Sequence, residues 1–118
     1  MVPAPAGDGV PRGERATIET MNWQATFESG EAGGPDPAWP ALVQALWYES
    51  RGDWDRAHDI CNEDEGKDSA WVHAFLHRVE GDLSNADYWY RRAGQRRPDG
   101  ELAIERAEIA TALASNEN

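Results

Sequence analysis

Two stretches of the chain, "ALWYESRGDWDRAHDIC" (45–61) and "AFLHRVEGDLSNADYWY" (74–90), align with each other without a gap and decide the fold. Each contains a Gly-Asp pair near its middle, and the two pairs stand 29 residues apart. Apolar residues recur at helical spacing before both pairs, and glycine readily takes the left-handed conformation that ends a helix. The alignment therefore predicts a helix, a Gly-Asp turn and a second helix, all repeated once.

The repeat is part of a predicted all-α domain over residues 37–115. Apolar spacing and helix-breaking residues predict about five helices, which make two helical hairpins and a C-terminal capping helix. The first helix is expected between Pro37 and the first Gly-Asp pair, and the others over residues 54–62, 70–80, 83–96 and 101–114.

Residues 1–36 are expected to form a mostly disordered or extended, flexible segment. The first 15 residues are rich in Pro, Gly and Ala, and "ESGEAGGPDP" (28–37) collects residues that break helices. Between them, "IETMNWQATF" (18–27) fits the spacing of a strand and also that of a helix. Its apolar side chains suggest that this segment packs on its own chain or on a second copy.

The second repeat unit resembles a tetratricopeptide repeat, whose signature has small and aromatic positions followed by a proline. The matching residues are Ala86, Tyr90, Ala93 and Pro98. The stretch "ADYWYRRAG" (86–94) is also similar to Sel1-like repeats, and residues 38–97 are similar to a group of small uncharacterised bacterial proteins. The resemblance implies a helical-repeat fold, in which Gly52, Ala57 and Gly81 have structural roles together with the signature residues.

The same resemblance implies a scaffold for protein or peptide binding or for assembly, with no enzymatic activity and no cofactor. In such repeats the first helix of each unit lines a concave binding face. Here that face would contain Leu42, Leu46, Glu49, Trp71, Phe75 and Arg78, with Glu105, Arg106 and Ile109 from the fifth helix. An aromatic pair beside an arginine has the composition of a binding hot spot. Alternatively, Trp71 and Phe75 belong to the core of the first hairpin.

The stretch "WVHAFLHRVEGD" (71–82) holds the side chains best suited to chemistry. Helical spacing brings His73, His77 and Glu80 to one face. Two histidines one turn apart can share a metal ion, but a zinc site needs at least three protein ligands. If the fold brought them close, the remaining ligands would come from Asp53, His58, Asp59 or Asp82.

A structural interpretation of this face is favoured over a site. In it, both histidines are hydrogen-bonded packing residues that face the partner helix near Ala86, Tyr90 and Ala93, so that no metal ion is expected. An unsatisfied imidazole there would cost about 1–3 kcal/mol. The alternative is a metal-dependent or acid–base enzyme centred on the two histidines and Glu80.

Composition narrows the classes of partner and location. The 118-residue chain carries a net charge of −11. Of the four segments 1–36, 37–68, 69–98 and 99–118, only residues 69–98 hold more bases (5) than acids (3). An acidic chain repels phosphates, so nucleic acid and membranes are not expected partners. The chain lacks an apolar run of ~18 residues and the features of a secretory signal. Its lone Cys61 cannot form an internal disulfide, so a reduced, cytoplasmic location is expected.

Overall fold

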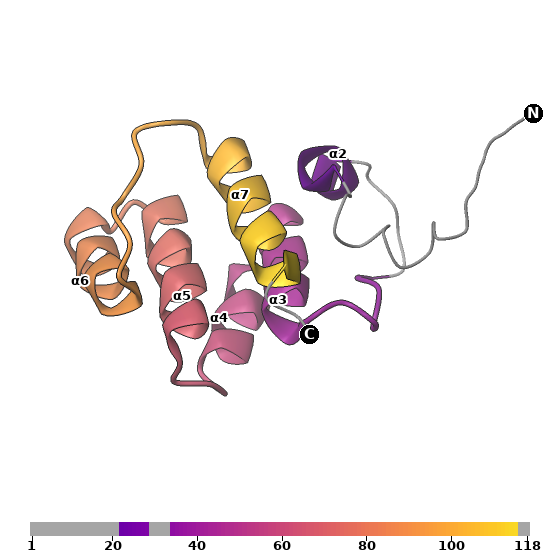
Figure 1. Ribbon diagram of the computed structural model, residues 1–118, viewed down its shortest axis with the longest axis horizontal. Coiled ribbons are helices and arrows are strands. Elements are labelled where there is room, and N and C mark those ends of the chain that lie inside the picture. The colour runs from indigo at the N-terminus through magenta and orange to yellow at the C-terminus, as the bar shows by residue number, and fades with distance from the viewer. Residues whose placement is uncertain (1–21, 29–33, 116–118) are drawn as a thin grey trace, which may run out of the picture.

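The computed structural model describes residues 22–28 and 34–115, which form six helices and no strand. The helices are α2 (Trp23–Glu28), α3 (Ala41–Ser50), α4 (Trp54–Cys61), α5 (Lys67–Val79), α6 (Leu83–Ala93) and α7 (Leu102–Ser115). Helices α3 and α4 form one hairpin, α5 and α6 form the second, and α7 returns across α3 and α5 (Figure 1). The predicted all-α class is confirmed. None of these helices has the length and apolar character of a membrane span.

The two hairpins close with the same turn. Gly52 and Gly81 have φ angles of 86° and 87°, in the left-handed region that only glycine adopts without steric cost. In each turn, the amide of the following aspartate donates to a carbonyl near the end of the first helix. These donor–acceptor pairs are Asp53 to Tyr48 and Asp82 to His77, both at 2.9 Å.

The aspartate of each turn also begins the second helix of its hairpin. The carboxylate of Asp53 accepts a hydrogen bond from the Arg56 amide, and that of Asp82 accepts one from the Asn85 amide. An aspartate in this N-cap position stabilises a helix by about 1 kcal/mol. Turn and cap therefore repeat at the offset of 29 residues seen in the sequence.

Small residues at the repeat positions let the helices of each hairpin approach closely. Ala57 of α4 and Ala86 of α6 are fully buried, and Ala93 is buried near the end of α6. Tyr90 is also buried, whereas Pro98 is half-buried in the connection from α6 to α7. The structural positions of the repeat are thus packed inside the hairpins.

Several helix boundaries differ from the sequence prediction, and α3 begins at Ala41 instead of near Pro37. Helix α5 begins at Lys67, three residues earlier than expected, because extended backbone at Gly66 allows the helix to start directly after the loop. Helix α6 ends at Ala93, three residues earlier than expected, because Gly94 takes a φ of 73° and stops it.

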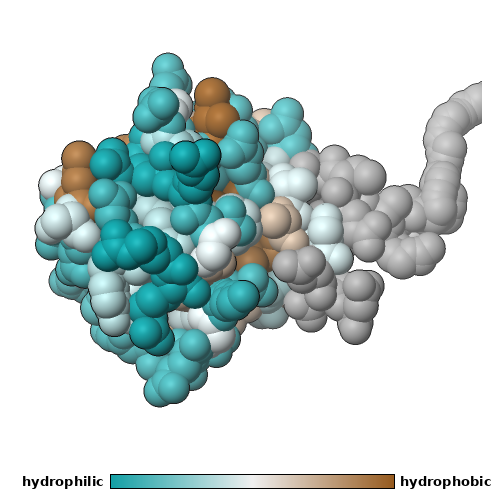
Figure 2. Space-filling model, turned by 60° about the vertical axis from the view of Figure 1, so that its left-hand side comes forward, coloured by the Kyte–Doolittle hydropathy of each residue, from teal (hydrophilic) through white to brown (hydrophobic). Residues whose placement is uncertain are grey.

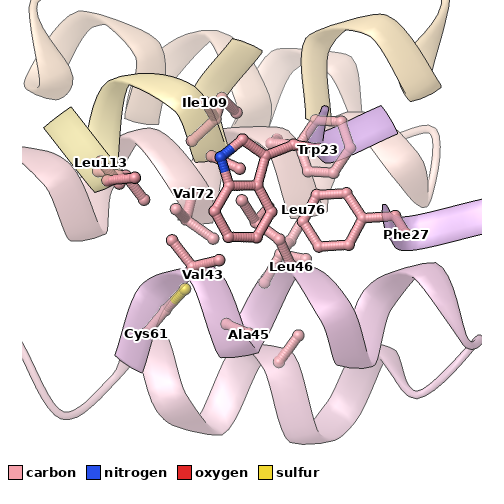
Figure 3. Close-up of a cluster of buried hydrophobic side chains, with 14 residues drawn as sticks. Trp23, Phe27, Val43, Ala45, Leu46, Cys61, Val72, Leu76, Ile109 and Leu113 are labelled. Carbon is pink, nitrogen blue, oxygen red and sulfur yellow. The ribbon is translucent and has the colours of Figure 1, made fainter. Parts of the chain in front are cut away.

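The core lies where α3, α5 and α7 meet, and α2 contributes to it. Figure 3 shows Trp23 and Phe27 among side chains from these three helices. The buried apolar residues around them include Val43, Leu46, Val72, Phe75, Leu76, Ile109 and Leu113. Helix α7 therefore completes the core, in addition to capping the array.

Part of the expectation for residues 1–36, a mostly disordered or extended segment, is corrected, because Trp23–Glu28 form helix α2. Trp23 and Phe27 stand one helical turn apart and are only 2% and 1% exposed. Burying two aromatic side chains on one face against α7 and α3 selects the helix over the strand that the spacing also allowed. The expectations for residues 1–21 and 29–33 lie outside the described residues.

Candidate functional site

All three histidines of the chain meet between α4, α5 and α6. His58 comes from α4, and His73 and His77 come from α5. The ring centroid of His58 lies 4.5 Å from that of His73 and 5.7 Å from that of His77. The ring centroids of the two α5 histidines are 5.0 Å apart. One nitrogen from each ring lies within 4.8 Å of the other two. We call these three residues the histidine cluster.

Hydrogen bonds orient the rings of the histidine cluster. The Nε2 atoms of His58 and His73 are 2.8 Å apart, so one donates its proton to the other. Nδ1 of His77 donates to Oε2 of Glu80 at 2.7 Å. The side-chain amide of Asn62 lies 3.3 Å from Nδ1 of His58. Each of the three rings therefore has a hydrogen-bond partner at a named ring nitrogen.

Two tryptophans stack on the histidine cluster from opposite helices. Trp54 of α4 lies parallel to His58, with centroids 4.7 Å apart and planes inclined by 12°. Trp89 of α6 stacks on His73 at 4.0 Å and 10°. Nε1 of Trp54 donates to the carbonyl of Leu76 at 2.7 Å, which fixes that indole on α5. The stacks limit rotation of both imidazoles.

Burial favours the neutral form of His73. His73 and His77 are each 7% exposed, and His58 is half-buried. Burial, followed by the charges of His58 and His77, lowers the pKa of His73 from 6.5 to about 4. At neutral pH this imidazole therefore keeps a free lone pair on one nitrogen.

The contacts of the predicted site residues differ from the sequence expectation. Glu80 bonds to His77, but His73 meets His58 and Trp89 instead. Four further residues were expected to serve as ligands only if the fold brought them close. Of these, His58 joins the cluster, and Asp82 lies close to His77 and Glu80. Both α5 histidines are buried and hydrogen-bonded, which the packing interpretation and a metal site both allow, so the packing interpretation stays a prediction.

A pocket of about 350 Å³ opens beside His73. It is lined by residues of α4, the α4–α5 loop, α5 and α6, including Cys61, Asp64, Ser69, His73, Trp89 and Arg92. Burial, followed by the Asp64 charge, raises the pKa of the Cys61 thiol to about 12, so this cysteine is not a nucleophile at neutral pH.

The face predicted to bind a partner is covered by α7 in this structure. Leu46 and Phe75 are fully buried in the core, while Leu42 and Trp71 are half-buried. Glu49 accepts two hydrogen bonds from Arg106 of α7, at 2.6 and 3.0 Å. The role of this face in binding a partner therefore stays a prediction, and a partner there would have to displace α7.

A second ion pair joins α7 to α5 and α6. Nη1 of Arg78 donates to Oε1 of Glu105 at 2.6 Å, and a further nitrogen of Arg78 donates to the Gly100 carbonyl. The hydroxyl of Tyr90 donates to Oε2 of Glu105 at 2.5 Å. Burial raises the pKa of both Tyr90 and Glu105. Tyr90, which the sequence analysis placed near the histidines, is thus hydrogen-bonded to Glu105 of α7.

Helix α6 carries an aromatic and basic surface outside the face that was predicted to bind a partner. The guanidinium of Arg92 lies 5.8 Å from the ring centroid of Tyr88 and 5.3 Å from that of Trp89. Tyr88 is 46% exposed, and Arg91 and Arg96 are exposed nearby. We call Tyr88, Trp89 and Arg92 the α6 surface. Figure 2, with this side of the molecule turned forward, shows a mostly hydrophilic face on which hydrophobic residues are scattered.

No family model, curated protein or solved structure matches the chain. The resemblance to tetratricopeptide and Sel1-like repeats therefore stays a prediction that rests on the residues named above.

Proposed function

We propose that this chain is a protein- or peptide-binding or assembly module of the tetratricopeptide-like type. The observation that carries the proposal is the α6 surface, where Arg92 lies over the rings of Tyr88 and Trp89. Tyrosine, tryptophan and arginine are the residues most enriched in binding hot spots. The repeated hairpin gives this surface a rigid support, because α6 packs extensively along α5.

The charge around the α6 surface favours an acidic segment of a partner protein. Residues 69–98 carry 5 bases and 3 acids, in a protein of net charge −11. Arg91 and Arg96 are exposed, whereas Arg97 is already paired with Asp87 at 2.8 Å. Arginine binds carboxylates through two parallel hydrogen bonds, so this surface suits Asp or Glu side chains.

The test compares the purified full-length chain with two α6 variants. Each protein is immobilised, partners from the source organism are identified by mass spectrometry, and a purified partner is then titrated. Arg92→Glu and Tyr88→Ala are expected to weaken its Kd by about 10-fold or more, which is the cost of losing a hot-spot side chain.

Arg56→Glu is the matched control for the charge change. Arg56 is an exposed arginine of α4 that lies 5.3 Å from the ring centroid of Tyr48, so it reproduces the arginine–aromatic pairing on another helix. It is expected to leave the Kd unchanged. Equal losses in all three variants would contradict a role for the α6 surface, and so would a partner that binds both α6 variants like the original chain.

The enzymatic alternative, a metal-dependent or acid–base site around His73, His77 and Glu80, stays a prediction. It is supported by the nitrogens that His73 and His77 present close to one of His58, and by the hydrogen bond from His77 to Glu80. The reaction itself has no support beyond the composition of the cluster.

A further inference from the structure

We propose that His58, His73 and His77 form a binding site for a divalent transition-metal ion of the zinc type. The chain contains three histidines in 118 residues, and all three present a nitrogen within 4.8 Å of one another. They come from two different helices, so an ion there would join the first hairpin to the second. The inference does not depend on the proposed binding of a partner protein.

The geometry is close to that of a three-histidine site. Zinc binds imidazole nitrogen at about 2.0–2.1 Å, so two nitrogens on a tetrahedral ion stand roughly 3.3 Å apart. The Nε2 atoms of His58 and His73 are 2.8 Å apart and already directed at each other. To bind one tetrahedral ion they would move apart by about half an ångström, and both rings would turn so that their lone pairs converge on the ion instead of on each other.

The groups around the cluster leave the Nε2 atoms of His58 and His77 available to bind a metal ion. Glu80 occupies Nδ1 of His77, and the Asn62 amide, which can turn its oxygen to the ring, lies at Nδ1 of His58. The Nε2 atoms of these rings are then free to bind an ion. The Asn85 amide is 3.5 Å from Nε2 of His77, a contact too long to compete with a metal bond. A carboxylate behind a ligating histidine is the usual arrangement in zinc proteins.

The donor set selects the class of ion. Imidazole nitrogens suit zinc, copper and nickel, whereas magnesium and calcium require oxygen ligands. Three protein ligands leave a fourth position for water or an exchangeable group. The pocket beside His73 gives an ion a route from solvent, past the carboxylates of Asp64 and Glu65.

The competing interpretation is that the cluster is hydrogen-bonded packing alone. In that case a substitution that keeps size and polarity would change stability, but zinc would have no specific effect. The two interpretations therefore differ in stoichiometry and in metal-dependent stability, and both quantities can be measured without knowing any activity.

The experiment uses the untagged full-length chain after treatment with a chelator, titrated calorimetrically with Zn²⁺ and, as a control, Mg²⁺. We expect one zinc per chain, no magnesium binding, and a rise of the Tm in zinc, because an ion that binds only the folded state stabilises it. His58→Gln and His77→Gln should each weaken the zinc Kd more than ~100-fold, beyond the 10- to 100-fold loss expected for the outer residue in Glu80→Gln.

Cys61→Ala is the control for an alternative soft ligand. Cys61 lines the same pocket, but its buried thiol is not part of the cluster, so this variant should bind zinc like the original chain. The helical circular dichroism and the Tm of each variant are recorded without metal, which separates unfolding from loss of the site. His58 is only half-buried, so His58→Gln is the variant expected to fold most normally.

A spectroscopic readout completes the test. In the folded chain, zinc should shift the ring ¹⁵N resonances of all three histidines together at one equivalent. A zinc Kd weaker than about 0.1 mM would overturn the proposal. It would also be overturned if zinc bound equally well to the folded histidine variants, or if Cys61→Ala abolished binding.

Discussion

Helix α5 presents polar side chains on two sides, and the fold uses them in different ways. Toward α7 it offers Arg78, whose charge is matched by the buried carboxylate of Glu105. Toward α4 and α6 it offers His73 and His77, which meet a third imidazole. Both sides are buried polar clusters, but one contains opposite charges and the other contains groups with exchangeable protons.

The two sides of α5 differ in whether their hydrogen-bonding atoms can still bind a ligand after folding. Both oxygens of Glu105 are bonded, to Arg78 and to Tyr90, so this side has no capacity left for a ligand. On the other side, His58 and His73 share one hydrogen bond between two nitrogens. A metal ion can bind both nitrogens once the shared proton has moved to Nδ1 of its own ring, and the Glu80 carboxylate at His77 then supplies a nearby negative charge. The α7 side is therefore suited to structure, and the histidine side to binding.

The largest expected effect comes from breaking the α7 side. Glu105→Ala leaves the Tyr90 hydroxyl without a partner and the Arg78 charge with only the Gly100 carbonyl, and removing one member of a buried ion pair costs about 3–5 kcal/mol. The free energy of unfolding, measured by urea denaturation, should fall by this amount.

The double variant Arg78→Leu/Glu105→Leu is the control for that prediction. Replacing both charges by apolar residues removes the unpaired group, so most of the lost stability should return. The exposed Arg97–Asp87 pair serves as the surface comparison, and Asp87→Asn should have much the smaller effect. Equal losses for the single and double variants would show that Glu105 does not act through its pairing with Arg78.

The two sides should also respond to acid in opposite directions. The pKa of His73 is lowered from 6.5 to about 4, so between these values the unfolded chain binds more protons than the folded one. Metal-free stability should therefore be complete above pH 6.5 and fall toward pH 4, by up to about 1.4 kcal/mol per pH unit. Burial raises the pKa of Glu105, so on that side the folded state takes up its proton first and acid does not weaken it.

The measurement is urea denaturation across this pH range in the presence of a chelator, for the original chain and for His73→Phe. His73 faces His58, His77 and Trp89 and, across the pocket, Arg92, Asp64 and Glu65. All of these groups are present in both proteins. The difference between the two curves isolates His73, and the original chain should lose more stability as the pH falls. Parallel curves would contradict the burial of a neutral imidazole.

How far the fold could be predicted from sequence depends on how local each signal is. The Gly-Asp turns and the apolar spacing act within a few residues, so the helices and hairpins were predictable. The position of α7 depends on pairs far apart in the chain, since Glu49 and Arg106 are separated by 57 residues. No local pattern shows that this arginine closes the face that Glu49 was expected to offer to a partner. The six-residue α2 was ambiguous because its aromatic residues suit a strand or a helix until α7 is in place.

The candidate site divides in the same way. The spacing of His73 and His77 places both on one face of α5 whatever surrounds them, and Glu80 follows within a turn. The contribution of His58 depends on how α4 is rotated about its axis against α5, which only the packed structure defines. One sequence signal was available: Trp54 and His58 stand one turn apart on the inner side of α4, where the Trp54 indole bonds to α5.

The smallest expected effect concerns the turn that ends α5, compared with the equivalent turn that ends α3. Gly52 and Gly81 share the same left-handed φ, and a Cβ at either position meets no atom within 4 Å. An alanine there is strained only by its backbone, at about 1–2 kcal/mol. Gly52→Ala and Gly81→Ala should therefore lower the free energy of unfolding by equal amounts in the metal-free chain, as measured in urea.

Because Glu80 directly precedes Gly81, zinc affinity should fall in Gly81→Ala alone if the orientation of this carboxylate supports the histidine cluster. Unequal losses without metal would show that the two turns are not equivalent, and equal zinc affinities would show that the cluster binds independently of the turn.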